Sequence, residues 1–312
     1  MTVTRLVGDI GGTNARFALC TPGGLPREER KLAVADYPGP VEAARAYLAG
    51  RAVEEAVLAV ATPVLGDAVA FTNSPWRFSI RAAEAALGVR HLAVINDFAA
   101  QAAALPLLEE ADLAVLKPGQ SRAEAPRLVL GPGTGLGVAW LLPEGGRLRI
   151  LPSEGGHASF APQDEEQDDV LRRLRRRHGG HVSAERLISG PGLLHLAQAL
   201  AERAGQDLPL AGPPDVTRRA ASGECPVSAR AVSLFCEILG GVAGNLALSL
   251  LAQGGVYVAG GLMRGLGPLL DRAALARGFT GKGRFAGYLD GIPITQMLRP
   301  HTGLLGAAAY QG

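Results

Sequence analysis

Residues 6–14 read Leu-Val-Gly-Asp-Ile-Gly-Gly-Thr-Asn, an apolar run that passes directly into a glycine-rich turn with Thr13 at its tip. A second turn of the same kind, Gly-Pro-Gly-Thr-Gly at 131–135, follows the apolar run 128–130. Glycine permits a positive φ and lets a ligand approach bare backbone N–H groups. We therefore expect two strand–turn–strand cradles that grip one polyphosphate from opposite sides.

Asp9 heads the first turn, where a carboxylate is placed to meet the metal ion that accompanies phosphates. The chain has three lysines, Lys31, Lys117 and Lys282. None is followed by Ser or Thr as in a P-loop, so the usual phosphate-binding lysine is missing. If a nucleotide binds, backbone amides, hydroxyl groups and a metal ion must hold its phosphates.

The chain has 312 residues, of which 47% are hydrophobic, and its net charge is +2. This length favours two lobes over a single core. The near-neutral charge argues against nucleic acid or an anionic membrane as the main partner. The basic run 172–178 follows the acidic residues of 164–169 on one predicted helix. That order of charges complements the helix dipole and indicates an ordinary solvated helix.

The cysteine spacing and a long uncharged segment indicate where in the cell the protein is expected. The three cysteines lack the spacing of a metal or redox motif, which predicts a reduced, cytosolic setting. Residues 238–263 carry no charge over a length that would suit a membrane span. The break at Gly254-Gly255 divides them into a buried helix and a buried strand instead. No signal peptide is expected, because Asp9 and the first glycine turn interrupt any apolar core.

Apolar periodicity and turn residues predict alternating strands and helices in the first third of the chain. There we expect strands at 5–8, 15–20, 31–35, 56–60, 69–71 and 91–95, and helices at 40–48, at 80–87 and from 96 or 97 onward. Residues 105–112 are interpreted as the crossing to a second lobe. In that lobe we expect strands at 113–116, 128–130, 136–142, 148–151, 255–259 and 292–296, a loop at 209–214, and a helix at 227–252. A closing helix is expected at 303–310.

Asn96 and Asp97 lie where a strand ends and a helix starts, a usual place for ligands in α/β sheets. The alternative is a helix N-cap, for which both residue types are favoured. A cap needs only one of the two, so the other has its polarity available for a different contact. Asn73, by contrast, is interpreted as part of a turn locked by Pro75, with Trp76 in the core.

Two later segments add polar groups. Residues 152–157, Pro-Ser-Glu-Gly-Gly-His, set Glu154 and His157 around a tight reversal, and the alternative there is a hairpin with a Gly-Gly loop. In residues 181–186, Glu185 is a candidate ligand, and the alternative is a helix capped by Ser183 with Glu185 in its first turn.

The candidate groups form an acceptor-rich set of carboxylates, one amide and one imidazole, which suits a neutral polyhydroxylated substrate. Beside two phosphate cradles, this set favours phosphoryl transfer to a hydroxyl group. That reaction needs a carboxylate to take the hydroxyl proton and a metal ion to neutralise phosphate charge.

Six strings in the same order resemble bacterial ATP-dependent glucokinases of the hexokinase/actin-like ATPase superfamily. They are LVGDIGGTNARFAL, INDFAAQA, LGPGTGLGVA, PSEGGHASFAP, GHVSAERLISGPGL and GGVYVAGGL. The resemblance runs from residue 6 to the C-terminal helix, and several of the strings are long enough to be highly specific.

The resemblance implies an α/β, two-lobed actin-like ATPase fold, ribonuclease H-like, with an interlobe cleft that closes on sugar. In that family the last helix returns to the small lobe. This implies a small α/β domain at residues 1–108 plus 299–312 and a large α/β domain at 109–298. A cytoplasmic homodimer without nucleic-acid or membrane partners is also implied.

The implied activity is that of a glucokinase, which transfers the γ-phosphoryl group of ATP to the 6-hydroxyl of glucose and yields glucose 6-phosphate and ADP, the first step of glycolysis. Mg²⁺ is the implied cofactor beside ATP. By matching motif, Asp97 resembles the general base. The implied partners of the other sugar hydroxyls are Asn96, Glu154, His157 and Glu185. The implied nucleotide contacts are Gly11, Gly12, Thr13, Asn14, Gly133, Thr134, Gly135, Gly260 and Gly261, and Asp9 resembles the acid that reaches Mg²⁺, through water.

Two alternatives remain open on the sequence. A sugar-responsive regulator or chaperone-like ATPase would share the fold, but the first strand begins by Arg5 and leaves no room upstream for a DNA-binding module. A chaperone-like ATPase has no use for the polar set around Asp97 and Glu185. Within the enzyme class, the alternative is a kinase for another hexose, such as fructose or mannose.

Overall fold

The computed structural model describes residues 4–311. By the packing of its residues the chain divides into two units. The first takes Met1–Glu109, Ile150–Pro152 and Arg299–Gly312, and the second takes Glu110–Arg149 and Ser153–Leu298. Each unit is described by itself.

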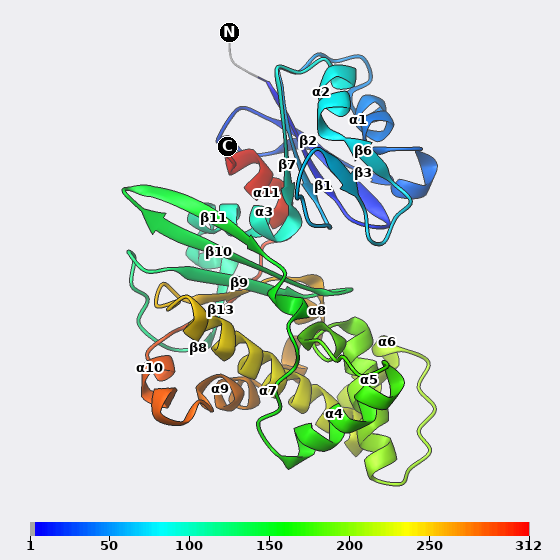
Figure 1. The fold of residues 1–312 in the computed structure, drawn as a ribbon, viewed down its shortest axis with the longest axis vertical. Helices are drawn as coiled ribbons and strands as arrows, with labels where there is room; N and C mark the ends of the chain where they lie inside the picture. Colours follow the sequence, from blue (N-terminus) through cyan, green and yellow to red (C-terminus); the bar gives the residue numbers. More distant parts are fainter. Residues whose placement is uncertain (1–3, 312) are drawn as a thin grey trace. The chain divides into compact units, whose positions relative to one another are not determined.

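The first unit is built on a five-stranded mixed sheet of order β3-β2-β1-β4-β7 (Figure 1). Its strands are β1 Arg5–Ile10, β2 Asn14–Cys20, β3 Arg27–Ala33, β4 Glu55–Val60 and β7 His91–Asn96. The unit's other elements are the small hairpin β5 Ala68–Ala70 and β6 Arg77–Ser79, the 3-10 turns Val34–Asp36 and Leu105–Leu107, and helices α1 Pro40–Leu48, α2 Ile80–Leu87, α3 Asp97–Ala104 and α11 Thr302–Ala309. β4 is parallel to both β1 and β7, whereas β2 is antiparallel to β1 and β3.

Side chains along the central strands point alternately to the two faces of the sheet. Each face packs in its own core. Leu6 and Ile10 of β1 face one core, in which residues of α1 and α2 pack. Val7 faces the other core, which contains residues of α3 and α11. Figure 1 shows these last two helices side by side although they are about 200 residues apart in the chain. Asp9 follows Val7 at the two-residue spacing and therefore lies on the α3/α11 face.

The second unit has a six-stranded sheet of order β11-β10-β9-β12-β13-β8. Its strands are β8 Leu113–Lys117, β9 Arg127–Pro132, β10 Leu136–Glu144, β11 Arg147–Ser153, β12 Val256–Val258 and β13 Ile294–Met297. Its helices are α4 Glu165–Arg177, α5 Gly190–Arg203, α6 Pro213–Ala221, α7 Pro226–Ser249, α8 Gly261–Leu266, α9 Arg272–Thr280 and α10 Ala286–Asp290. The 3-10 turns are Glu110–Asp112, Gly155–His157, Ala184–Arg186, Gly267–Leu269 and Gly283–Phe285.

Glycines let α7 and α9 approach closely in the core of the second unit. A Cβ on Gly240 of α7 would lie 2.0 Å from the backbone oxygen of Leu275, and one on Gly278 of α9 would lie 1.9 Å from that of Glu237. α7 is the one helix within residues 4–311 that is long and apolar enough to cross a membrane, and 72% of its apolar window is buried inside the unit. Its apolar surface is therefore explained by packing.

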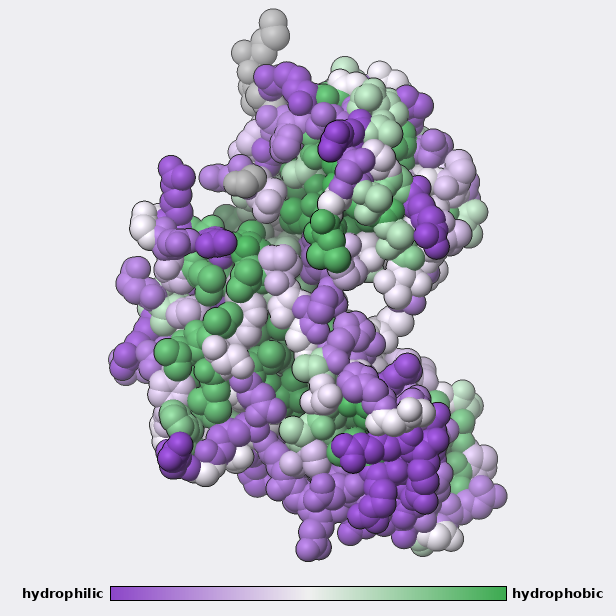
Figure 2. Space-filling model, in the orientation of Figure 1, coloured by the Kyte–Doolittle hydropathy of each residue, from purple (hydrophilic) through white to green (hydrophobic). Residues whose placement is uncertain are grey.

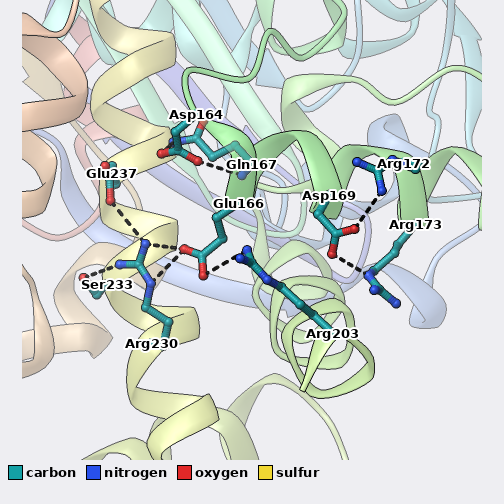
Figure 3. A network of polar contacts seen from close by, with 10 residues as sticks. All are labelled: Asp164, Glu166, Gln167, Asp169, Arg172, Arg173, Arg203, Arg230, Ser233 and Glu237. Atoms are coloured by element: carbon teal, nitrogen blue, oxygen red, sulfur yellow. Dashed lines mark hydrogen bonds and ion pairs between the residues drawn. The ribbon is translucent and has the colours of Figure 1, made fainter. Parts of the chain in front are cut away.

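Ion pairs join the helices of the second unit (Figure 3). Glu166 of α4 accepts from Arg230 Nε of α7 at 2.9 Å and lies 3.4 Å from Arg203 of α5. Along α4, Asp169 pairs with Arg172 and Arg173 at 3.1 and 2.8 Å. Figure 2 shows the corresponding hydrophilic surface over α4 and α5. The acid-first, base-last helix predicted for 164–178 is confirmed, since Asp164 caps α4 by accepting from Gln167 N.

Several predicted elements need correction. The strand predicted at 31–35 is β3 at Arg27–Ala33, and the next three residues form a 3-10 turn. The loop predicted at 209–214 ends sooner, because α6 begins at Pro213. The long helix ends at Ser249, not at 252, because Leu251 takes a positive φ of 52°. Proline at the start of α6 is common, since its missing N–H is one the helix does not need there.

Candidate active site

Seven of the predicted site residues belong to the first unit, where the parallel strands bring them to one edge of the sheet. Ile10 is paired with Val60, and Val60 with Asn96. The carboxyl ends of β1, β4 and β7 therefore meet at that edge, which is where α/β sheets bind ligands. The residues gathered there are Asp9, Gly11, Gly12, Thr13, Asn14, Asn96 and Asp97.

The first glycine turn is closed by its own backbone. Gly11 N donates to Asn14 O at 2.9 Å, and Val34 N donates to Thr13 O at 2.9 Å, while the Thr13 side chain is exposed. Gly11 and Gly12 do not take the positive φ that glycine permits. Gly12 is instead required by close packing, because a Cβ there would lie 2.6 Å from Asn73 O.

Asn73 thus lies beside this turn, a contact that its interpretation as part of a turn locked by Pro75 did not include. Trp76 is buried, as predicted, and Asn73 itself is exposed. Nothing in the local sequence of residues 72–76 indicates the contact with Gly12, since it depends on how the β5–β6 hairpin packs on the first turn.

Asn96 and Asp97, at the end of β7, have different roles at the start of α3. Asn96 caps α3, since its Oδ1 accepts from Phe98 N at 2.9 Å and Ala99 N at 3.3 Å. Its Nδ2 donates to Thr62 O, at 3.4 Å. Asp97 is the first residue of α3, is half-buried, and accepts from Phe98 N at 2.9 Å. The cap is therefore Asn96, and Asp97 adds a second carboxylate to this edge beside Asp9.

Asp9 is half-buried, and burial raises its pKa above the ordinary value of an aspartate. The positive charges of Arg16 and His301 oppose that rise, and Glu29 adds to it. Arg16 is the residue directly opposite Asp9 in the β1–β2 register. The site therefore holds a carboxylate whose negative charge is costly there and which a cation would stabilise.

The other predicted residues belong to the second unit, where the second glycine turn joins β9 to β10. Gly133 N donates to Gly135 O at 2.8 Å, and Gly190 N at the start of α5 donates to Gly133 O at 2.8 Å. Thr134, at the tip, is exposed. Neither glycine has a positive φ. A Cβ on Gly135 would lie 2.3 Å from Glu185 Oε2, whereas one on Gly133 would meet open space.

Glu154, His157 and Glu185 form a chain of side chains next to this turn. His157 Nε2 lies 3.7 Å from Glu154 Oε2, and His157 Nδ1 lies 3.9 Å from Glu185 Oε1. Glu185 Oε2 also accepts from Leu136 N, the first residue of β10, at 2.9 Å. Two carboxylates and an imidazole, partly exposed, are thereby held beside the Gly133–Gly135 backbone.

Both structural alternatives for these segments are wrong. Residues 155–157 form a 3-10 turn, not a hairpin loop, and a Cβ on Gly156 would lie 2.1 Å from Leu136 O. Ser183 precedes another 3-10 turn and makes no side-chain cap bond. Glu185 therefore does not serve a capped α-helix, and its carboxylate serves the second glycine turn.

Gly260 and Gly261 adjoin the same turn from the neighbouring strand. β12 is parallel to β9, and Ala259 N donates to Leu130 O at 2.8 Å. Gly260 has a φ of 103°, and a Cβ on it would lie 2.6 Å from Pro132 O. This is the glycine of the site where a positive φ and a close backbone approach are both required.

Asp9 is the candidate acid for a metal ion. Within residues 4–311 no group of three or more His, Cys, Asp or Glu side chains could hold a metal ion. Mg²⁺ usually takes one or two carboxylates together with phosphate oxygens and waters. The raised pKa of the Asp9 carboxyl and its place beside the first glycine turn fit a magnesium ion that arrives with a phosphate group.

Comparison with known proteins agrees with this chemistry. The family model for glucokinase matches residues 6–312. The glucokinase of Yersinia enterocolitica is 44% identical over 99% of this chain and 97% of its own length, and that of Citrobacter koseri is 43% identical over the same shares. Among solved structures, a glucokinase from an Antarctic psychrotroph has a TM-score of 0.89 and 36% identity, and the match covers 99% of this chain and 98% of that one. The predicted resemblance and the α/β actin-like ATPase fold are confirmed.

Replacing Asp9 by Asn tests its electrostatic environment. The pKa of Asp9 is higher in the folded state than in the unfolded state, so its protonated form favours folding. This contribution to stability is fully present below the unfolded pKa of about 3.9. It is lost as the pH rises through the folded pKa. In magnesium-free urea unfolding, Asp9→Asn should exceed the wild type in free energy of unfolding at pH 7.5. That advantage should shrink as the pH approaches 4.

The matched control for this measurement is Asp36→Asn, at an exposed aspartate of the same unit. It should not show such a gain. An Asp9→Asn protein that is less stable than the wild type at pH 7.5 would contradict a costly charge at this position.

Proposed function

Because the chain belongs to the glucokinase family, it is an ATP-dependent hexose kinase that phosphorylates glucose, and we propose that the γ-phosphoryl group passes to the 6-hydroxyl of the sugar. The observation that carries the proposal is the common edge in the first unit. There the first glycine turn, Asp9 and Asp97 follow the carboxyl ends of neighbouring parallel strands. At this edge the backbone of the glycine turn is suited to bind a phosphate group, and the Asp97 carboxylate is suited to accept the proton of an alcohol.

Asp97 is proposed as the general base that accepts the proton of the sugar 6-hydroxyl as the phosphorus–oxygen bond forms. Its place as first residue of α3 orients the carboxylate, because Asn96 takes over the cap and Phe98 N donates to Asp97 Oδ1. Asn96 is proposed to bind a neighbouring sugar hydroxyl through its amide.

Glu154, His157 and Glu185 are proposed as partners of the remaining hydroxyl groups. A sugar hydroxyl both donates and accepts, and a histidine between two carboxylates offers both kinds of partner. Binding through several such groups gives the site selectivity, because an analogue that lacks a hydroxyl leaves buried polar groups unpaired.

The nucleotide is proposed to lie on the two glycine turns. Thr13 and Thr134 lie exposed at the tips of these turns, while Gly11 N and Gly133 N are used within them. Gly260 and Gly261 are proposed as the contact on the adenosine side, where the absence of a side chain leaves room. Mg²⁺, when bound through water to Asp9, would neutralise phosphate charge.

The proposed setting follows from the same resemblance. The functional domains are proposed at 1–108 plus 299–312 and at 109–298, and the two packing units support this division. We also propose a homodimer without nucleic-acid partners, acting in the cytoplasm at the first step of glycolysis. The three cysteines, all free and buried, support a reducing compartment.

The activity is tested by ATP turnover with a panel of hexoses. Turnover should depend on glucose, because closure around the sugar excludes water from the phosphate. The kcat/KM for glucose should exceed that for fructose and mannose. Sugar-independent hydrolysis would favour a chaperone-like ATPase, and a higher kcat/KM for another hexose would replace glucose as the substrate.

Asp97→Asn tests the general base with little change in shape. The amide still accepts from Phe98 N but does not take a proton, so kcat should fall by at least ~10²-fold. Glucose affinity measured by calorimetry should change much less, since the position keeps its hydrogen-bonding atoms. A near-normal kcat would remove Asp97 from this role.

Glu185→Gln tests the sugar contacts of the second unit. Glutamine keeps an oxygen for Leu136 N and loses only the charge. The KM for glucose should rise by roughly 10-fold or more, the size expected for a lost charge-assisted bond, with a smaller change in the KM for ATP. Equal changes in both constants would mean that Glu185 mainly supports the glycine turn.

A further inference from the structure

The start of α11, residues 301–303, lies against Asp9 from the far end of the chain. A Cβ on Gly303 would lie 2.7 Å from Asp9 Oδ2 and 2.8 Å from its Cγ. Gly303 has no positive φ, so its backbone would accept any residue. Glycine is needed at 303 only because the Asp9 carboxylate occupies the space of a side chain.

His301 extends this contact into a cluster of charged groups. Its Nδ1 lies 2.9 and 3.0 Å from the two carboxylate oxygens of Glu29. Glu29 Oε1 in turn accepts from Arg16 at 2.8 Å, and Arg16 is the cross-strand neighbour of Asp9. Arg16, Glu29 and His301 are thus linked beside Asp9, while Gly303 packs directly against its carboxylate.

Thr302 connects the same segment to α3. Its buried hydroxyl donates to Gln101 Oε1 at 2.5 Å, and Gln101 is four residues after Asp97 on that helix. Residues four apart lie on one face of a helix. Further along, a Cβ on Gly306 would lie 1.7 Å from Ala100 O, so the two helices touch through their backbones. Figure 1 shows α11 and α3 side by side.

We propose that His301, Thr302 and Gly303 are positioning residues that hold the Asp9 carboxylate and the Asp97 helix in a fixed relation within the first unit. This inference rests on the roles proposed above for Asp9 and Asp97. The three residues act through those carboxylates and do not touch substrate. Gly303 packs directly on Asp9, His301 contacts Glu29, and Thr302 donates to Gln101 of the helix that Asp97 begins. Thr302 and Gly303 are buried.

Gly303→Ala is the sharpest test, because alanine favours a helix and should not lower stability for local reasons. The added methyl group must displace the Asp9 carboxylate, a short side chain with little freedom. We expect kcat to fall by at least ~10-fold, near the low end for a misplaced catalytic group, with an unchanged affinity for glucose. Gly287→Ala, in α10 with open space around it, is the matched control and should behave as wild type.

A binding measurement provides a readout other than turnover. The change in melting temperature caused by ADP is measured with and without magnesium. The difference between these two changes is the metal-dependent shift. Gly303→Ala should lose most of that difference, as Asp9→Asn should. In the double variant, Gly303→Ala should add no further loss to Asp9→Asn, because residues that act as a unit are not additive.

His301→Asn and Thr302→Val separate the two contacts. Asparagine tolerates the left-handed conformation at 301, where φ is 56°, but does not reproduce the ion pair with Glu29. It should weaken the metal-dependent shift. Thr302→Val keeps the shape without the hydroxyl, and it should lower kcat several-fold while leaving the metal-dependent shift unchanged.

The outcomes distinguish this inference from the proposed function. If Asp9→Asn loses kcat and the metal-dependent shift while Gly303→Ala keeps both, the positioning role is overturned and the proposed function stands. If Asp9→Asn itself keeps both, the metal role of Asp9 fails and the positioning role fails with it. Additive losses in the double variant would also overturn it, since Gly303 would then act elsewhere.

Discussion

The parallel pairing of β1, β4 and β7 is the constraint on which the site of the first unit depends. Because these strands run in one direction, their carboxyl ends reach one edge together, with Val60 paired to both Ile10 and Asn96. A glycine turn, an acid and a helix that begins with a second acid follow from that edge. Were one strand reversed, Asp97 would lie at the opposite end of the sheet from the first glycine turn.

Close backbone packing has the corresponding role in the second unit. Gly135 leaves the space that Glu185 fills, Gly156 touches the backbone of Leu136, and Gly260 touches Pro132. A side chain at any of these positions would push apart the second glycine turn and the Glu154–His157–Glu185 chain. Stability and function are therefore tied to the same glycines, since the contacts that pack this unit also shape its polar surface.

Local signals in the sequence were sufficient where the structure depends on neighbours in the chain. α1 and α2 have the predicted bounds, because Pro40 starts one and Ser79 caps the other. The three-residue strand β6 was missed, since so short a segment carries no periodicity. Failures at the site have a different cause. The sequence indicates both glycine turns, but not that Gly12 and Gly135 are required by Asn73 and Glu185, which are distant in sequence.

The placement of α11 has a consequence for biosynthesis. β1 and α3 emerge early from the ribosome, yet one face of their sheet is completed by residues 302–309, which follow all of the second unit in translation order. The second unit is nearly continuous in sequence and has its own core, so it is able to fold while the chain is still growing. This face of the N-terminal sheet is therefore covered only after residues 302–309 have been synthesised.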